Sequence, residues 1–241
     1  MARILVTGAS TGLGLLTAQS LVRQGHDVVL HARAAERVED APLLRRVLGT
    51  VYGDLADLDA VRRIAEEAHR FAPFDAVIHN AGVSDGPDLV AVNVIAPYAL
   101  TGLMERPSRM IVLSSSMHRG GATNHVAEGI AGRRTVTYSD TKLWATAVLM
   151  GIAGRWSGTL AHAVDPGWVP TRMGGPSASD DLTEGHRTQE WLAVTPVDGI
   201  HPRTGGYWHH RQPRRPHPAA LDARFQDEVI AALEERTGIE L

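Results

Sequence analysis

The sequence of 241 residues contains no cysteine, which excludes disulfide bonds, thiolate metal ligands and a cysteine nucleophile. Basic residues are not in excess, because 24 Lys and Arg stand against 27 Asp and Glu, and this balance does not favour a nucleic-acid partner. No apolar run approaches the roughly 18 residues that span a bilayer, and no signal-peptide pattern opens the sequence. We therefore expect a cytoplasmic protein with neither nucleic acid nor a membrane as partner.

Lysine is nearly absent as well, because Lys142 is the only one and the other 23 of the 24 basic residues are arginine. Lysine differs from arginine in that its pKa shifts readily on burial. Tyr138 lies four residues earlier, and a predicted helix over 136–153 places the phenol and the amine on one face. A cation there is expected to lower the tyrosine pKa from roughly 10 toward neutrality. The pair indicates a general acid or base; the alternative is a surface lysine beside a tyrosine at the edge of the core.

Short apolar runs alternate with amphipathic helical patterns along most of the chain. The predicted strands are 3–7, 27–32, 50–52, 74–79, 110–113, 160–164 and 205–208. Asp57 is a predicted N-cap of one helix, and a closing helix is predicted over 222–237 with Gly238 as its stop. This alternation predicts an α/β fold, a Rossmann-type doubly wound parallel sheet of about seven strands, in a single domain over residues 1–241.

A glycine-rich turn joins the first predicted strand to the first helix at 7–14. Backbone N–H groups of such a turn can approach a pyrophosphate at the positive end of the helix. The spacing of Gly8, Gly12 and Gly14 differs from G-x-G-x-x-G, so a purely structural turn is the alternative. Arg33 follows the second strand, where an arginine accommodates a 2′-phosphate and favours NADP over NAD; a solvated arginine is the alternative.

Polar residues stand at several other strand ends, where ligands of parallel sheets bind. Asp54, Asn80 and the serines 114–116 occupy these places, although such residues also satisfy local backbone groups. The segment 173–193 shows little periodicity, and we expect a mobile substrate lid over about 172–206. His209, His210 and His217 have no carboxylate at ligand-like spacing, so we expect no metal site and an irregular packed extension there.

The ordered set of motifs resembles the short-chain dehydrogenase/reductase family over residues 1–172. The matching motifs are Thr7-Gly8-x-x-x-Gly12-x-Gly14, Asn80-Ala81-Gly82, Asn93, Ser114-Ser115, Tyr138-x-x-x-Lys142 and Pro166-Gly167 through Thr171. The run 114–118 and the tail 206–218 look most like the branch of retinol dehydrogenases and secondary-metabolite ketoreductases. The resemblance implies a nicotinamide cofactor and a small-molecule carbonyl or alcohol substrate.

The resemblance also implies a role for each matching residue. Ser115 would orient the substrate carbonyl, and Tyr138 would donate the proton as hydride leaves the nicotinamide. Lys142 would lower the pKa of the tyrosine and hold the ribose, and Asn93 would anchor a water that relays protons to Lys142. The implied cofactor-binding residues are Gly8, Ser10, Thr11, Gly12, Leu13, Arg33, Asp54, Leu55, Asn80, Ala81, Gly82, Tyr138, Lys142, Pro166, Gly167, Val169 and Thr171.

We therefore predict a carbonyl reductase or alcohol dehydrogenase that prefers NADP(H), with NAD(H) as the second possibility. A cofactor-binding regulator without turnover is one alternative, and an epimerase or dehydratase on a related fold is another. The helix around Asn93 is shorter than the family usually shows; it commonly builds homo-oligomer contacts, so the oligomeric state stays open. Trp168, Met173 and Trp191 indicate an apolar ligand, or else core packing.

Overall fold

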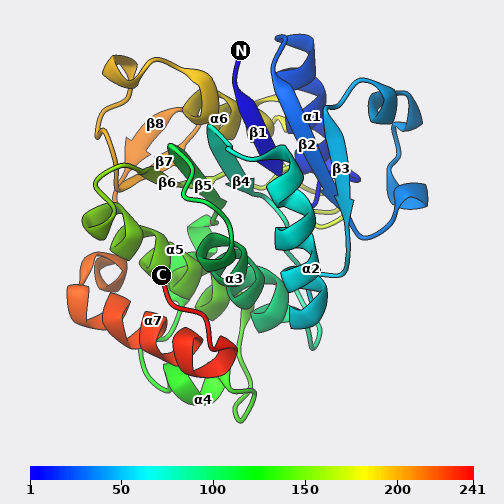
Figure 1. Ribbon diagram of the computed structural model, residues 1–241. Coiled ribbons are helices and arrows are strands. Elements are labelled where there is room, and N and C mark those ends of the chain that lie inside the picture. Colours follow the sequence, from blue (N-terminus) through cyan, green and yellow to red (C-terminus); the bar gives the residue numbers. More distant parts are fainter.

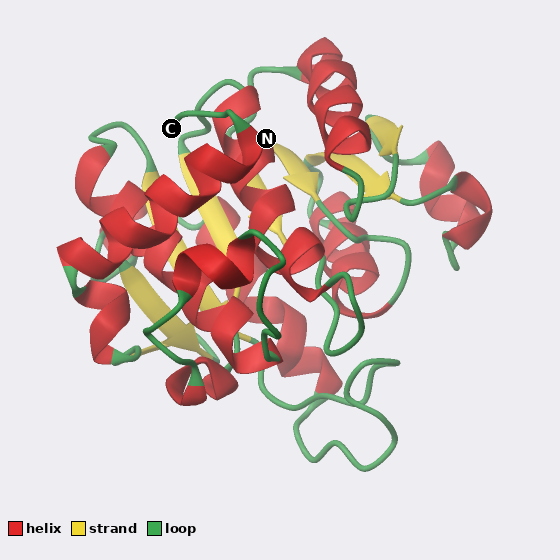
Figure 2. Cartoon of the chain, turned by 90° about the horizontal axis from the view of Figure 1, so that it is seen from below, coloured by secondary structure: helices red, strands yellow, loops and turns green.

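Alternate residues of the central strands face two separate apolar cores. In the computed structural model, which describes residues 1–241, Ile4 and Val6 belong to one core and Leu5 to the other. Ile111 and Met110 divide in the same way. A strand that is apolar on both faces must be covered on both, which is typical of a parallel sheet between helix layers. Figure 2 shows the strands between helices.

The sheet has eight strands in the order β3-β2-β1-β4-β5-β6-β7-β8 (Figure 1). Their bounds are β1 Arg3–Val6, β2 Asp27–Ala32, β3 Gly49–Tyr52, β4 Ala76–His79, β5 Arg109–Leu113, β6 Leu160–Asp165, β7 Gly206–His209 and β8 Gln212–Arg214. The first seven are parallel, and β8 is antiparallel to β7. The predicted doubly wound parallel sheet is confirmed, with one antiparallel edge strand beyond the expected seven.

Seven α-helices cover this sheet. They are α1 Gly12–Arg23, α2 Leu58–Ala68, α3 Ala96–Leu103, α4 Val126–Ile130, α5 Tyr138–Arg155, α6 Leu182–Val194 and α7 Ala223–Thr237. Helices α1 and α6 share the core of one face, and α2, α3, α5 and α7 share the core of the other. The predicted N-cap Asp57 and the stop at Gly238 are confirmed, because the Asp57 side chain caps α2 and Gly238 ends α7 with φ of 67°.

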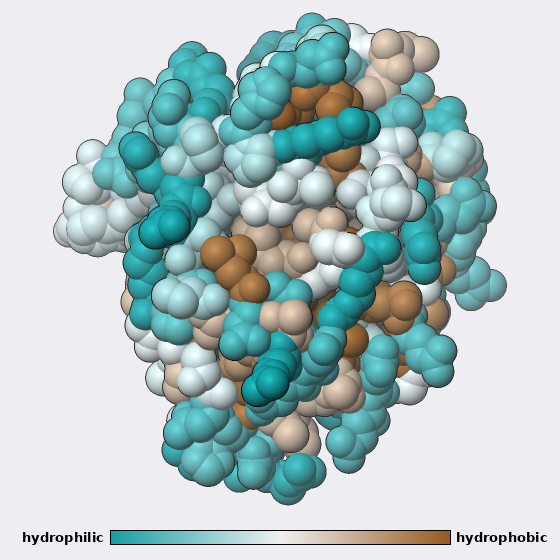
Figure 3. All heavy atoms as spheres, turned by 90° about the vertical axis from the view of Figure 1, so that its left-hand side faces the viewer, coloured by the Kyte–Doolittle hydropathy of each residue, from teal (hydrophilic) through white to brown (hydrophobic).

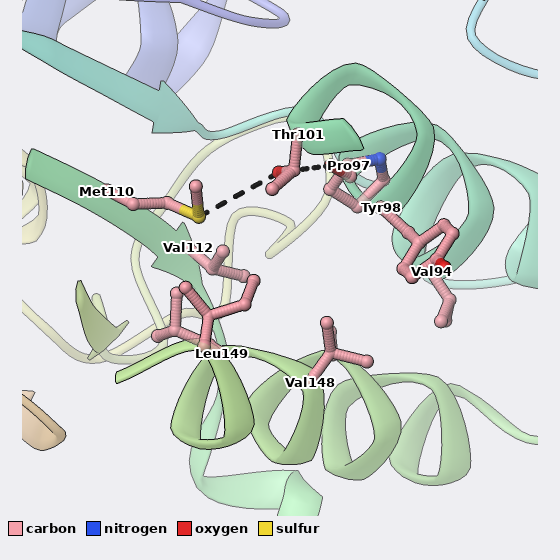
Figure 4. A pocket seen from close by; sticks show the side chains of 10 residues that line it. Val94, Pro97, Tyr98, Thr101, Met110, Val112, Val148 and Leu149 are labelled. Atoms are coloured by element: carbon pink, nitrogen blue, oxygen red, sulfur yellow. Dashed lines mark hydrogen bonds between the residues drawn. The ribbon is translucent and has the colours of Figure 1, made fainter. Parts of the chain in front are cut away.

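The short helix near Asn93 begins as a π-helical turn, Ala91–Ile95, and continues as α3. The carboxyl end of the chain lies against it, since the Tyr98 hydroxyl donates to the Ile239 carbonyl at 2.7 Å. Between α3 and α5 an apolar cavity of about 20 Å³ remains (Figure 4). This volume leaves room for about one water molecule, so we regard the cavity as a packing defect of the core.

Two expectations about the last third of the chain are wrong. The segment predicted to be irregular, 173–193, contains α6, whose buried face is largely polar and carries His186, Gln189 and Glu190. The extension predicted to be irregular beyond His209 contains β8, which forms a hairpin with β7, the strand predicted over 205–208. Trp191 packs edge-on against Trp208 with ring centroids 5.1 Å apart, so it belongs to the core.

The side of the molecule that carries β8 and the start of α7 is mixed in polarity. Figure 3 shows separate brown areas on this side, divided by hydrophilic and neutral atoms. None of the helices combines the length and the apolar character needed to cross a membrane. No group of three histidine or acidic side chains is arranged to hold a metal ion.

Three strand histidines make the stability of the fold sensitive to acid. Burial lowers the pKa of His31, His79 and His162 from 6.5 to about 4. Between these two pH values the unfolded chain binds more protons than the folded chain, so the free energy of unfolding falls as pH decreases from 6.5 to about 4. We predict that melting temperatures drop across this window and that His79→Leu shows a shallower drop. Parallel slopes in the variant and the wild type would contradict this assignment.

Candidate active site

The carboxyl ends of the parallel strands meet at one edge of the sheet, and most of the predicted site residues follow them. The glycine turn follows β1, Arg33 follows β2 and Asn80 follows β4. Ser115 lies just beyond β5, and Pro166 directly follows β6. Because β1, β4, β5 and β6 are consecutive neighbours in the sheet, four of these five sites lie side by side at this edge, where ligands of such sheets bind.

The glycine turn lies so close to the Asn80–Gly82 loop that side chains do not fit between them. A Cβ atom at Gly8, where φ is 63°, would lie 2.8 Å from the Cα of Ala81. A Cβ at Gly14 would lie 2.4 Å from both the Asn80 Nδ2 and the Gly8 carbonyl oxygen. The N-cap of α1, Thr11, makes no side-chain capping bond, and the first turn has no acidic residue. Free N–H groups and bare backbone at a helix start fit a phosphate group.

The side chains of its first residue and of the loop after β4 hold the turn in place. Thr7 Oγ1 accepts hydrogen bonds from the backbone N–H groups of Asn80 and Ala81 at 3.0 and 3.1 Å. Asn80 Nδ2 in return donates to the carbonyls of Thr7 and Gly8 at 2.9 and 3.2 Å. The amide of Asn80 is therefore a support of the turn.

The sequence reasoning missed His31, which supports the turn from β2. Its Nδ1 accepts from the Gly8 N–H at 3.1 Å, and its Nε2 lies 3.1 Å from the Gly53 carbonyl. This arrangement requires the neutral Nε2–H tautomer, which agrees with a pKa lowered by burial to about 4. In the sequence, the feature that could have indicated this role is the presence of a histidine in a strand that is otherwise largely apolar.

Tyr138 is the first residue of α5, and its position is set by the helix cap. Thr137 and Asp140 form a capping box, and Asp140 Oδ1 also accepts from the Ala122 N–H at 2.7 Å. This bond ties the loop after Ser115 to the start of the helix. Ser115 itself caps the 3₁₀ turn Ser116–Gly120 by accepting from Met117 N–H at 3.2 Å.

Lys142 is buried one turn further along the helix. Its Nζ donates to the Leu113 carbonyl at 2.7 Å and lies 5.5 Å from the centroid of the Tyr138 ring. Burial lowers the pKa of Lys142 from 10.5 to about 8. The predicted placement of phenol and amine on one helix face is confirmed.

The expectation that the pKa of Tyr138 falls is wrong for the protein without a bound cofactor. Burial raises the pKa of Tyr138 to about 12; the Ser115 hydroxyl opposes this shift, and the Asp165 carboxylate adds to it. Asp165 lies at the end of β6, with its Oδ2 3.7 Å from His209 Nδ1. The sequence shows Asp165 only as the residue before Pro166-Gly167, so its effect on Tyr138 depends on tertiary structure.

Asn93 lies beside Lys142 across Gly82. A Cβ at Gly82 would be 3.2 Å from Asn93 Oδ1 and 3.4 Å from Lys142 Nζ. Asn93 Nδ2 donates to the Val83 carbonyl at 2.9 Å and to Thr141 Oγ1 at 3.0 Å. The π-helical turn that carries Asn93 is a rare geometry found often at functional sites.

The loop after β6 turns back onto the glycine turn. The Thr171 side chain lies 3.6 Å from the position of a Cβ at Gly12, and Val169 and Leu13 both contact Gly185 of α6. Arg33 is exposed at the end of β2 and has no carboxylate within ion-pair distance. The remaining predicted residues lie at the same edge, with Asp54 exposed after β3, Leu55 buried, Ser10 in the turn, and Gly167 with φ of 84°.

Comparisons with known proteins bear on the family and the fold. A family model described as short chain dehydrogenase matches residues 2–181. The chain is 35% identical to the short-chain dehydrogenase chyC of Penicillium rubens, over 100% of this chain and 99% of that protein. It is 30% identical to human retinol dehydrogenase 14, over 71% of this chain and 62% of that protein. A solved structure, the NADPH-bound carbonyl reductase from chicken fatty liver, shares the fold with a TM-score of 0.66 at 19% identity, over 87% of this chain and 96% of that one.

The contact between Gly14 and the Asn80 loop gives a direct test of the turn. We predict that Gly14→Ala destabilises the fold by about 1–3 kcal/mol, because the two closest atoms include backbone that cannot move away. Gly154→Ala is the control, since Gly154 lies in α5 with no atom near its Cβ position and should gain helix propensity. Urea unfolding measures the free energy of unfolding of both variants. Equal values for the two variants would refute the close packing at Gly14.

Proposed function

This chain belongs to the short-chain dehydrogenase family and is an oxidoreductase, and on that premise we propose that it transfers hydride between NADP(H) and a ketone, an aldehyde or a secondary alcohol. The observation that carries the proposal is the Tyr138–Lys142 pair at the start of α5, beside Ser115 and facing the edge where the glycine turn lies. We propose that the whole chain forms one cofactor-binding domain and that the segment 172–206 borders the substrate pocket.

The cofactor would lie along the edge of the sheet. The turn from Gly8 to Gly14 would hold the pyrophosphate, Arg33 the 2′-phosphate, and the loop from Pro166 to Thr171 the nicotinamide end. Asp54 and Leu55 would border the adenine. The bound nicotinamide supplies or accepts the hydride. The NADPH bound by the chicken carbonyl reductase supports this choice of cofactor.

The raised pKa of Tyr138 supports this phenol as the proton donor when the proposed reaction runs toward reduction. With a pKa of about 12 the phenol is protonated throughout the physiological range, so it can donate its proton to the oxygen of a carbonyl group. Ser115 would orient that oxygen. The Lys142 ammonium, present below a pKa of about 8, would stabilise the phenolate that remains. Asn93 would anchor the water that returns a proton through Lys142.

The substrate would contact an apolar wall at the crevice. Met117, Trp168 and Met173 follow β5 and β6 and expose 55%, 54% and 48% of their surface, and they are three of the six exposed large hydrophobic residues. Exposed apolar side chains gathered beside polar groups are typical of a ligand site. We propose a small molecule with an apolar body and one carbonyl or hydroxyl group.

Tyr138→Phe tests the proposed acid. We predict a loss of turnover of about 100-fold or more, because no other proton donor replaces the phenol, with NADPH affinity changed by less than about threefold. Tyr98→Phe is the control, since it removes a hydroxyl that bonds only the Ile239 carbonyl. Steady-state reduction of a panel of ketones and aldehydes, with NADPH fluorescence for binding, measures both. Activity of Tyr138→Phe near that of the control would refute the assignment.

Arg33→Ala tests the preference for NADP(H). We predict that the Kd for NADPH rises about tenfold while the Kd for NADH is unchanged, because only NADPH carries the 2′-phosphate. Arg23→Ala is the control, because Arg23 is the last residue of α1 and the glycine turn lies at the other end of that helix. Titration of nucleotide fluorescence gives both constants, and equal losses for the two nucleotides would remove Arg33 from the 2′-phosphate.

A further inference from the structure

An ion pair crosses the proposed cofactor site. Arg172 Nη2 lies 3.3 Å from Glu39 Oε1. Arg172 belongs to the loop after β6 and Glu39 to the loop after β2, and β1, β4 and β5 lie between those strands in the sheet. The pair therefore joins the nicotinamide side of the proposed site to its adenosine side.

Both residues of the ion pair lie in segments that contact the glycine turn. The backbone N–H of Glu39 donates to the Ser10 carbonyl at 3.0 Å. Thr171, directly before Arg172, lies 3.6 Å from the position of a Cβ at Gly12. The guanidinium of Arg172 is thus held beside the start of α1, where the turn offers its N–H groups.

The turn itself has no charged side chain between Thr7 and Gly14, so a phosphate there meets backbone dipoles and hydroxyl groups but no positive charge. Arg172 is the cation that the structure brings to this place. Its side chain is 77% exposed and that of Glu39 is 57% exposed, and such exposed pairs contribute little stability. Arg172 makes a single hydrogen bond to Glu39, at 3.3 Å. A guanidinium can bind a phosphate through two parallel hydrogen bonds, so exchange of Glu39 for a phosphate would add a bond.

We propose that Arg172 binds a phosphate of the dinucleotide and that Glu39 competes with this phosphate for the same guanidinium. This inference rests on the proposed cofactor. According to the proposal, Arg172 raises the affinity for the cofactor and Glu39 lowers it.

Two variants test the inference by binding alone. We expect Arg172→Ala to weaken nucleotide binding about fivefold and Glu39→Gln to tighten it about twofold. These changes in affinity are modest because interactions between exposed charges contribute little free energy. Kd values for NADPH and NADH come from nucleotide fluorescence at fixed ionic strength, without substrate. Arg155→Ala is the matched control, because Arg155 is also an exposed arginine paired with a carboxylate, Asp227 of α7, and it lies at the far end of α5 from Tyr138.

The two nucleotides identify the phosphate. Equal weakening of NADPH and NADH by Arg172→Ala would support contact with the pyrophosphate, and weakening of NADPH alone would support contact with the 2′-phosphate. Affinities of Arg172→Ala equal to those of Arg155→Ala, or weaker binding by Glu39→Gln, would overturn the inference and leave the cofactor proposal intact. Binding of neither nucleotide by the wild-type protein would overturn both.

Discussion

The burial of one ammonium group fixes the positions of the elements that carry the candidate site. Lys142 is only 4% exposed, and its Nζ donates to the Leu113 carbonyl. A buried charge is costly unless it is hydrogen-bonded, so the end of β5 and the second turn of α5 must stay in register. Gly82 lies against the same group, since a side chain there would meet both Lys142 and Asn93. Arginine would bring a forked set of N–H donors to this confined place, which explains why the single lysine stands here.

The glycine turn depends on a second constraint, the lack of space between two loops. Its backbone contacts the loop after β4 so closely that Gly8 and Gly14 admit no side chain. Thr7, Asn80 and His31 then satisfy the backbone groups that this contact leaves without helix or strand partners. The result is a rigid turn whose remaining N–H groups are free to face a ligand at the start of α1.

Sequence patterns predicted the elements whose buried faces are apolar. The strands and α5 were found because valine, isoleucine and leucine recur at the right period. Helix α6 was missed because its buried face carries His186, Gln189 and Glu190, which bond among themselves and to Ser20 and Thr17 of α1. A hydrophobic pattern cannot reveal a helix that is held by hydrogen bonds. Strand β8 was missed for a related reason, since it is exposed, and the residues of the turn before it, His210 and Arg211, are not usual for positive φ.

The sequence by itself determined the family, the parallel sheet and the identity of most candidate site residues, because these depend on local periodicity and on motifs of fixed spacing. It also determined that Tyr138 and Lys142 share one helix face. Only the tertiary structure decided the environment of that pair. Burial raises the pKa of Tyr138 and lowers that of Lys142, and Asp165 comes from a strand that is distant in the sequence. Desolvation and charge proximity depend on which segments meet in space, and the order of residues along the chain does not specify them.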